Sequence, residues 1–62
     1  MKVKQVIKIL EANGWTHSRT KGDHRVFTKP GQRPIVIAGH ENDDMPKGTE
    51  SAILRQANLK KS

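Results

Sequence analysis

Cysteine is absent from the 62-residue chain, so neither disulfides nor thiolate metal sites can stabilise it. Tyrosine is also absent, and the sequence contains one tryptophan, Trp15, and one phenylalanine, Phe27. No apolar run approaches the roughly 18 residues of a membrane span. Charges interrupt the apolar residues near the N-terminus, unlike a signal peptide. These absences exclude a disulfide scaffold and a membrane helix, and they make the cytoplasm the default location.

Acidic side chains are few. Six Asp and Glu stand against twelve Lys and Arg, which gives a net charge of +6. Such an excess favours binding to a polyanion, most often nucleic acid, although a merely basic surface is the plainer alternative. The length allows one small domain, 1–62, which buries only about 60% of the surface of its unfolded chain. We therefore expect a flat working surface or dependence on a partner, not a large hydrolytic cleft.

The apolar spacing predicts a helix at each end. A stripe at helical spacing indicates a first helix over Lys2–Asn13, ended by Gly14. The stripe consists of Val3, Val6, Ile7 and Leu10. A second helix is expected from Pro46 to about Asn58, with Asp43 and Asp44 before its positive end and Lys60 and Lys61 beyond its negative end. Its core residues would be Ile53, Leu54 and Ala57.

Three strands are predicted between the helices. They are expected over Trp15–Thr20, His24–Thr28 and Arg33–Ala38. Two loop lengths are open for the first hairpin, and a three-residue loop, 21–23, places Trp15 and Phe27 on one face, so we favour it. The fold class is then α+β, in the order αβββα, with both helices on one face of an antiparallel sheet. The double-stranded RNA-binding domain has the same order, which by itself is only an analogy about function.

His24 is the candidate catalytic residue. Strand alternation places it opposite Phe27, on the open face beside a turn. Imidazole changes charge between about pH 5 and 8, so it can take or give the proton that RNA cleavage moves. The alternative is a plain surface histidine. His17 is expected to be partly buried and hydrogen-bonded, and His40 to hold its loop against the second helix.

Cations surround this stretch and are predicted to contact RNA phosphates. The predicted RNA-binding set is Arg19, Lys21, Gly22, Arg25, Lys29 and Arg33. No metal-ligand spacing, phosphate-binding glycine motif or serine nucleophile elbow is present. We therefore expect neither a metal nor another cofactor.

Taken together, these residues resemble the HicA family of mRNA interferases, the toxin half of a toxin–antitoxin pair. The resemblance covers nearly the whole chain. It rests on Asn13-Gly14-Trp15, Gly22-Asp23-His24 with Arg25-Val26-Phe27, Pro30, Ile35-Val36-Ile37, His40, Lys47-Gly48-Thr49 and Ile53-Leu54-Arg55-Gln56-Ala57. Two positions depart from the pattern: Asp23 replaces the usual serine, and Asn58 replaces a common glycine. A carboxylate at Asp23 is expected to favour the protonated form of His24.

The resemblance implies a metal-independent endoribonuclease that cleaves mRNA with His24 as its catalytic histidine. It also implies a HicB-type antitoxin that covers the active face. A non-catalytic RNA-binding module of the double-stranded type is the alternative, and a subunit that works only inside a protein complex is a third. We expect no membrane partner.

Overall fold

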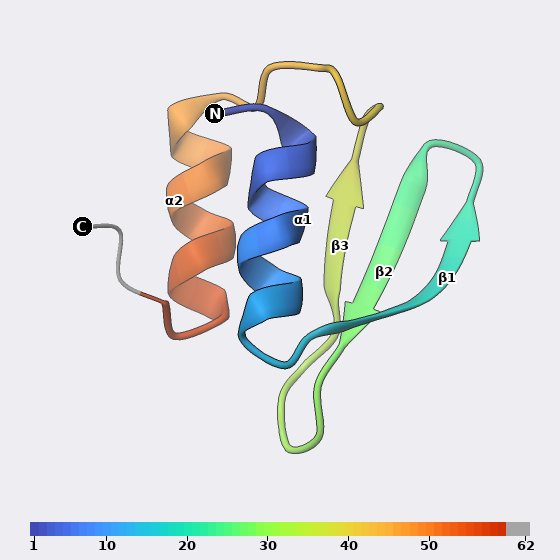
Figure 1. Cartoon of the computed structure of the whole chain (residues 1–62), viewed down its shortest axis with the longest axis vertical. Coiled ribbons are helices and arrows are strands. Elements are labelled where there is room, and N and C mark those ends of the chain that lie inside the picture. The colour runs from blue at the N-terminus through green and yellow to red at the C-terminus, as the bar shows by residue number, and fades with distance from the viewer. Residues whose placement is uncertain (60–62) are drawn as a thin grey trace.

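The fold follows the expected element order. The structure, a computed structural model, describes residues 1–59, so Lys60 and Lys61 lie outside the described residues. The elements are α1 (Val3–Ala12), β1 (Thr16–Lys21), β2 (His24–Thr28), β3 (Ile35–Ala38) and α2 (Lys47–Gln56) (Figure 1). The antiparallel strands lie in the order β1-β2-β3. The predicted α+β class and αβββα order are confirmed.

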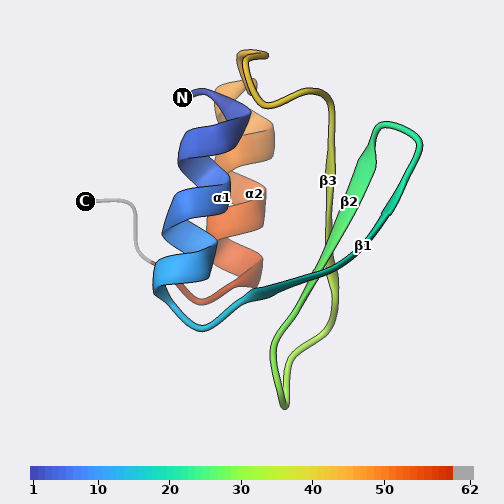
Figure 2. The same ribbon diagram turned by 45° about the vertical axis from the view of Figure 1, so that its right-hand side comes forward.

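Both helices lie in one layer on the same side of the sheet (Figure 2). Their apolar stripes bury against the strand residues that point toward them. The core comprises Val3, Val6 and Leu10 from α1, Trp15, Phe27, Ile35 and Ile37 from the sheet side, and Met45, Ile53 and Ala57 from the α2 side. No helix of the described residues lies over the opposite face of the sheet, as the sequence predicted. Within residues 1–59, no helix is long and apolar enough to cross a membrane.

Turn chemistry ends α1 where the sequence predicted. Asn13 follows the helix, and its side-chain amide donates to the Ile9 carbonyl at 2.7 Å. Gly14 has φ +91°, a left-handed conformation that residues with a Cβ rarely adopt. The chain then reverses, and the Trp15 amide donates back to the Leu10 carbonyl at 3.0 Å. This reversal brings Trp15 under the helix, where it is 2% exposed.

The predicted three-residue loop of the first hairpin is wrong. Lys21 pairs with His24, so the loop has two residues, and the positive φ of Gly22 (+59°) fits a type II′ turn. A regular hairpin with this turn would place Trp15 and Phe27 on opposite faces. Instead the register shifts between His17 and Arg19. One extra residue in this β-bulge returns Trp15 to the Phe27 face, so the expected shared face is correct although its cause is different.

The start of α2 also differs in detail from the prediction. Pro46 precedes the helix as its N-cap, and the helix ends at Gln56. Asp44 pairs with Lys2 at 3.2 Å, and the Asp43 carboxylate accepts from the His40 amide at 3.0 Å. These carboxylates therefore anchor the loop before α2. Asn58 has φ +60°, which explains why a glycine suits this position.

Because of the bulge, two single-residue deletions in β1 should differ in their effect on the free energy of unfolding. Deleting Ser18 leaves a regular hairpin in which Trp15 still faces the helices, so we expect the free energy of unfolding to change by less than about 1 kcal/mol. Deleting Thr16 keeps the bulge but turns Trp15 to the open face. Loss of that burial should cost about 3–5 kcal/mol. Urea unfolding of both variants measures the difference, and equal losses would show that the bulge does not set the register.

Candidate functional site

The open face of the sheet carries a small set of polar side chains around an apolar centre. Cross-strand partners share a face, so the pairing of the strands assigns each residue to one side. The open-face residues are Thr16, Arg19 and Lys21 of β1, His24, Val26 and Thr28 of β2, and Val36 and Ala38 of β3. Val36 is 53% exposed, which shows that no described element covers this face.

His24 begins the central strand on this face. Its partners are Lys21 on one side and Ala38 on the other. The side chain is exposed, so the ring makes no part of the core. Lys21 directly opposite, and Arg19 one open-face position farther along β1, supply positive charge on the side toward β1. Ala38 leaves the side toward β3 sterically open.

The β1–β2 turn adjoins this histidine. A Cβ built on Gly22 would meet no atom within 4 Å, so a ligand can approach the backbone there. The carbonyl of Asp23 accepts from the Gly39 amide at 3.0 Å, and its carboxylate lies 3.8 Å from Nε2 of His40. The predicted role of His40 against the second helix is therefore wrong. This side chain instead lies near the turn beside His24.

Arg25 lies on the opposite face from its neighbour His24. It pairs with Ile37 and Thr20 on the helix-facing side. Its guanidinium lies 3.6 Å from the Glu41 carboxylate, and the side chain is only 23% exposed. Although Arg25 and His24 are adjacent in the sequence, Arg25 lies on the helix-facing side of the sheet and His24 on the open face.

Lys29 and Arg33 lie at the other end of β2 and β3 from His24. The Lys29 ammonium donates to the Asn13 carbonyl at 2.9 Å and so ties the second turn to the end of α1. Arg33 is exposed in the loop before β3. The fold therefore brings Arg19, Lys21 and Gly22 close to His24, and it separates the other three predicted RNA-binding residues from it.

His17 lies on the helix-facing side, and it is hydrogen-bonded as predicted, but it is exposed and not partly buried. Its ring centroid lies 5.4 Å from that of Phe27, and Nε2 is 2.7 Å from the Thr20 hydroxyl. The hydrogen bond follows from the bulge, because the extra residue places both side chains on the same side of β1. His17 and His24 consequently lie on opposite faces.

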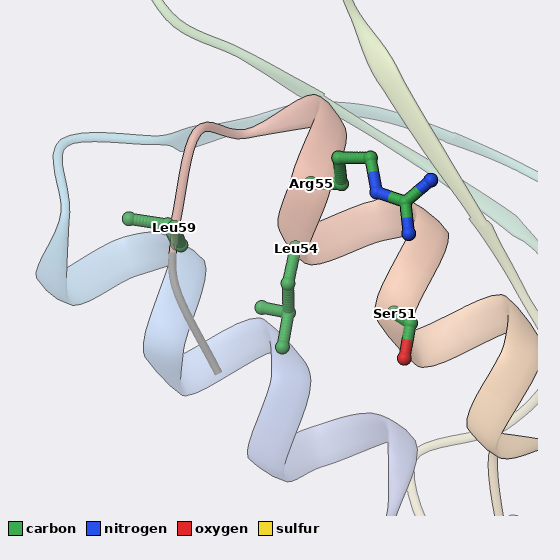
Figure 3. A pocket seen from close by; sticks show the side chains of 4 residues that line it. All are labelled: Ser51, Leu54, Arg55 and Leu59. Carbon is green, nitrogen blue, oxygen red and sulfur yellow. The ribbon is translucent and has the colours of Figure 1, made fainter. Parts of the chain in front are cut away.

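His24 lines none of the described hollows of the surface. One, lined by Ser51, Leu54, Arg55 and Leu59, is on α2, where Leu54 points toward α1 (Figure 3). Glu50 of α2 is buried 3.6 Å from the Met1 amino group, and α2 lies on the side of the sheet away from the open face. Among residues 1–59, no three His, Asp or Glu side chains form a group that could hold a metal ion. The candidate site is thus a flat one.

Comparisons with known proteins give a consistent result. The family model described as HicA toxin of bacterial toxin–antitoxin matches residues 3–59. A chain of a toxin–antitoxin complex from Streptococcus pneumoniae is 42% identical, with a TM-score of 0.83 over 95% of this chain and 98% of that one. No curated protein matches the sequence. Since the family model spans both helices and all three strands, the chain belongs to the HicA family of toxins from bacterial toxin–antitoxin systems.

Proposed function

We propose that this toxin is an endoribonuclease that cleaves mRNA on the open face of the sheet, with His24 as general acid or base. The observation that carries the proposal is the position of His24. It is an exposed histidine on an uncovered face, paired directly across the hairpin with Lys21. Phosphodiester cleavage needs proton transfer and stabilisation of negative charge, and a histidine beside a permanently charged lysine can supply both.

In this proposal each element of the site has a separate task. The His24 imidazole takes a proton from the attacking hydroxyl or gives one to the leaving 5′-oxygen. Lys21 and Arg19 stabilise the negative charge that develops on the phosphoryl oxygens. Gly22 lets the backbone of the turn approach a phosphate without steric hindrance. Attack by the 2′-hydroxyl would leave a cyclic phosphate, whereas attack by water would not.

A flat site suits a single-stranded substrate and a protein inhibitor. His24 lines none of the described hollows, so RNA that crosses the sheet at this histidine meets a surface and not a deep cleft. The solved neighbour is a toxin–antitoxin complex, which supports an antitoxin partner. We infer that this partner is of the HicB type, presents acidic groups to Arg19 and Lys21, and blocks RNA from His24. Cleavage of mRNA also places the site of action in the cytoplasm.

His24→Ala should abolish most cleavage while the fold is retained. The ring is exposed, so its removal should change the free energy of unfolding by less than about 0.5 kcal/mol. Loss of a general acid or base should slow single-turnover cleavage by about 10²–10⁴-fold. The measurements are thermal unfolding and mass spectrometry of RNA termini.

His17→Ala is the matched control, because it removes an exposed histidine from the opposite face. It should cleave RNA at nearly the wild-type rate. Near-wild-type cleavage by His24→Ala would remove this histidine from the mechanism. Intact RNA with every variant, wild type included, would instead favour the RNA-binding module.

Cleavage should persist in excess EDTA. The proposed chemistry uses a protein imidazole and protein cations, so no step needs a divalent ion. The wild type is assayed with EDTA and again after addition of Mg²⁺, Mn²⁺ or Zn²⁺ in excess. Loss of activity with EDTA and recovery with one of these metals would overturn the histidine mechanism.

The two lysines at opposite ends of the hairpin should differ in their effect on RNA binding. Each phosphate contact with a single strand contributes about 0.7 to the slope of log affinity against log salt concentration. Lys21→Gln should therefore lower the slope by about 0.7. Lys29→Gln should leave the slope unchanged, because its ammonium already binds the Asn13 carbonyl. Fluorescence anisotropy over a salt series measures both, and equal decreases would restore Lys29 to the RNA-binding set.

A further inference from the structure

β3 forms one edge of the sheet, and its outer side has no strand beside it among residues 1–59. The hydrogen-bond pattern shows which groups point outward. The Gly39 amide donates to Asp23 directly opposite, so this is a hydrogen-bonded pair. Such pairs recur at every second residue of an antiparallel ladder. Ile37 and Ile35 therefore bond to β2, while the amides and carbonyls of Val36 and Ala38 point away from the sheet.

The two edges of the sheet differ in how they resist pairing with another chain. The outer strand β1 carries Arg19, Lys21 and a bulge, which are features that prevent strand addition. β3 itself is less protected, because Ile35–Ala38 contains no charge, no proline and no bulge, although Pro34 precedes it and accepts a hydrogen bond from the Gln56 side chain at 3.2 Å. A row of free backbone groups on such an edge is a template for a further strand.

A groove accompanies this edge. It has a volume of about 310 Å³ and lies between the edge of β3 and the first turns of α2. Much of its lining is apolar, from Val3, Val36, Ala38, Met45, Pro46 and Ile53. The two carboxylates at its rim are already engaged, Asp44 by Lys2 and Asp43 by the His40 amide. A strand beside β3 would direct every second side chain toward the helix layer, where this groove takes an aliphatic one.

We propose that the antitoxin binds by adding an extended strand to the outer edge of β3. The strand bonds to the backbone of Val36 and Ala38, and it places an aliphatic side chain in the groove beside α2. This inference rests on the proposed function, because it names how the inhibitor of that site is held.

Charge selects the antitoxin over a second copy of the toxin as the occupant. Each copy of the toxin carries a net charge of +6, so two copies repel each other as they approach. An acidic partner is attracted to a toxin with this net charge. The edge also continues into the site, since Ala38 is the cross-strand partner of His24. An added strand would lie roughly two strand spacings, about 10 Å, from β2. The part of the antitoxin chain that follows the added strand can therefore cover His24.

Amide hydrogen exchange of the wild-type toxin, free and in complex with its antitoxin, tests the proposal by NMR. The amides of Val36 and Ala38 should exchange fast in the free toxin and at least about tenfold more slowly in the complex. The Thr20 amide points outward from β1 by the same alternation and serves as the internal control. Its exchange should not slow to this degree.

Val36→Pro removes one outward amide that the fold does not use, which edge strands tolerate. With an unchanged melting temperature, it should weaken antitoxin affinity by about tenfold, the equivalent of one hydrogen bond. Thr20→Pro, the same change on the other edge, should leave affinity unchanged. A loss with Thr20→Pro alone would place the added strand on β1 and overturn the proposal.

The outcomes separate this inference from the proposed function. A complex that inhibits cleavage but leaves Val36 and Ala38 unprotected overturns the strand addition and keeps the nuclease. An antitoxin that does not bind overturns both the proposed partner and the strand addition, whatever the toxin does to RNA. Slow exchange of Val36 and Ala38 in the toxin alone, with a concentration-dependent dimer in light scattering, would make a second copy the occupant and also overturn the proposal.

Discussion

Burial of Phe27 is the constraint on which the arrangement of the site depends. Full burial of such a side chain contributes about 1.5–3 kcal/mol, and Phe27 is 1% exposed. Since strand side chains alternate, fixing Phe27 toward the helices fixes His24 toward solvent three residues earlier. A slip by one residue would exchange the two faces and bury the histidine. The bulge in β1 has the same origin, because it lets Trp15 join Phe27 in the core despite the two-residue turn.

The sheet separates two kinds of surface across its width. Its β1 side is basic and contains the bulge, and Lys21 on this side is the cross-strand partner of His24. Its β3 side is formed by a short apolar strand, and Ala38 on this side is the other cross-strand partner of His24. In our proposal RNA is held from the first side and the antitoxin strand from the second. Inhibition then needs no change in the toxin fold, because RNA and the antitoxin compete only for the space over His24 on the open face.

The predicted RNA-binding residues show why closeness in sequence is a poor guide to a site on a sheet. Arg25 follows His24 directly, yet it lies on the other face and contacts Glu41. Lys29 is only five residues from His24, but its ammonium is used by the end of α1. His40 is sixteen residues away, yet its Nε2 lies 3.8 Å from the carboxylate of Asp23 in the turn that precedes His24. Strand alternation and loop closure, not sequence distance, select these neighbours.

The sequence by itself determined the element order, the core stripes of the helices and the face of His24. Each of these follows from local periodicity and from the need to bury the few large apolar residues. The family resemblance, carried by motifs along nearly the whole chain, was also present in the sequence. Only the tertiary structure decided the bulge at Ser18, the partners of Arg25, Lys29 and His40, and the free edge beside Val36. These features depend on which segments meet across the sheet, and a two-residue turn with a bulge buries the same apolar residues as a three-residue turn without one.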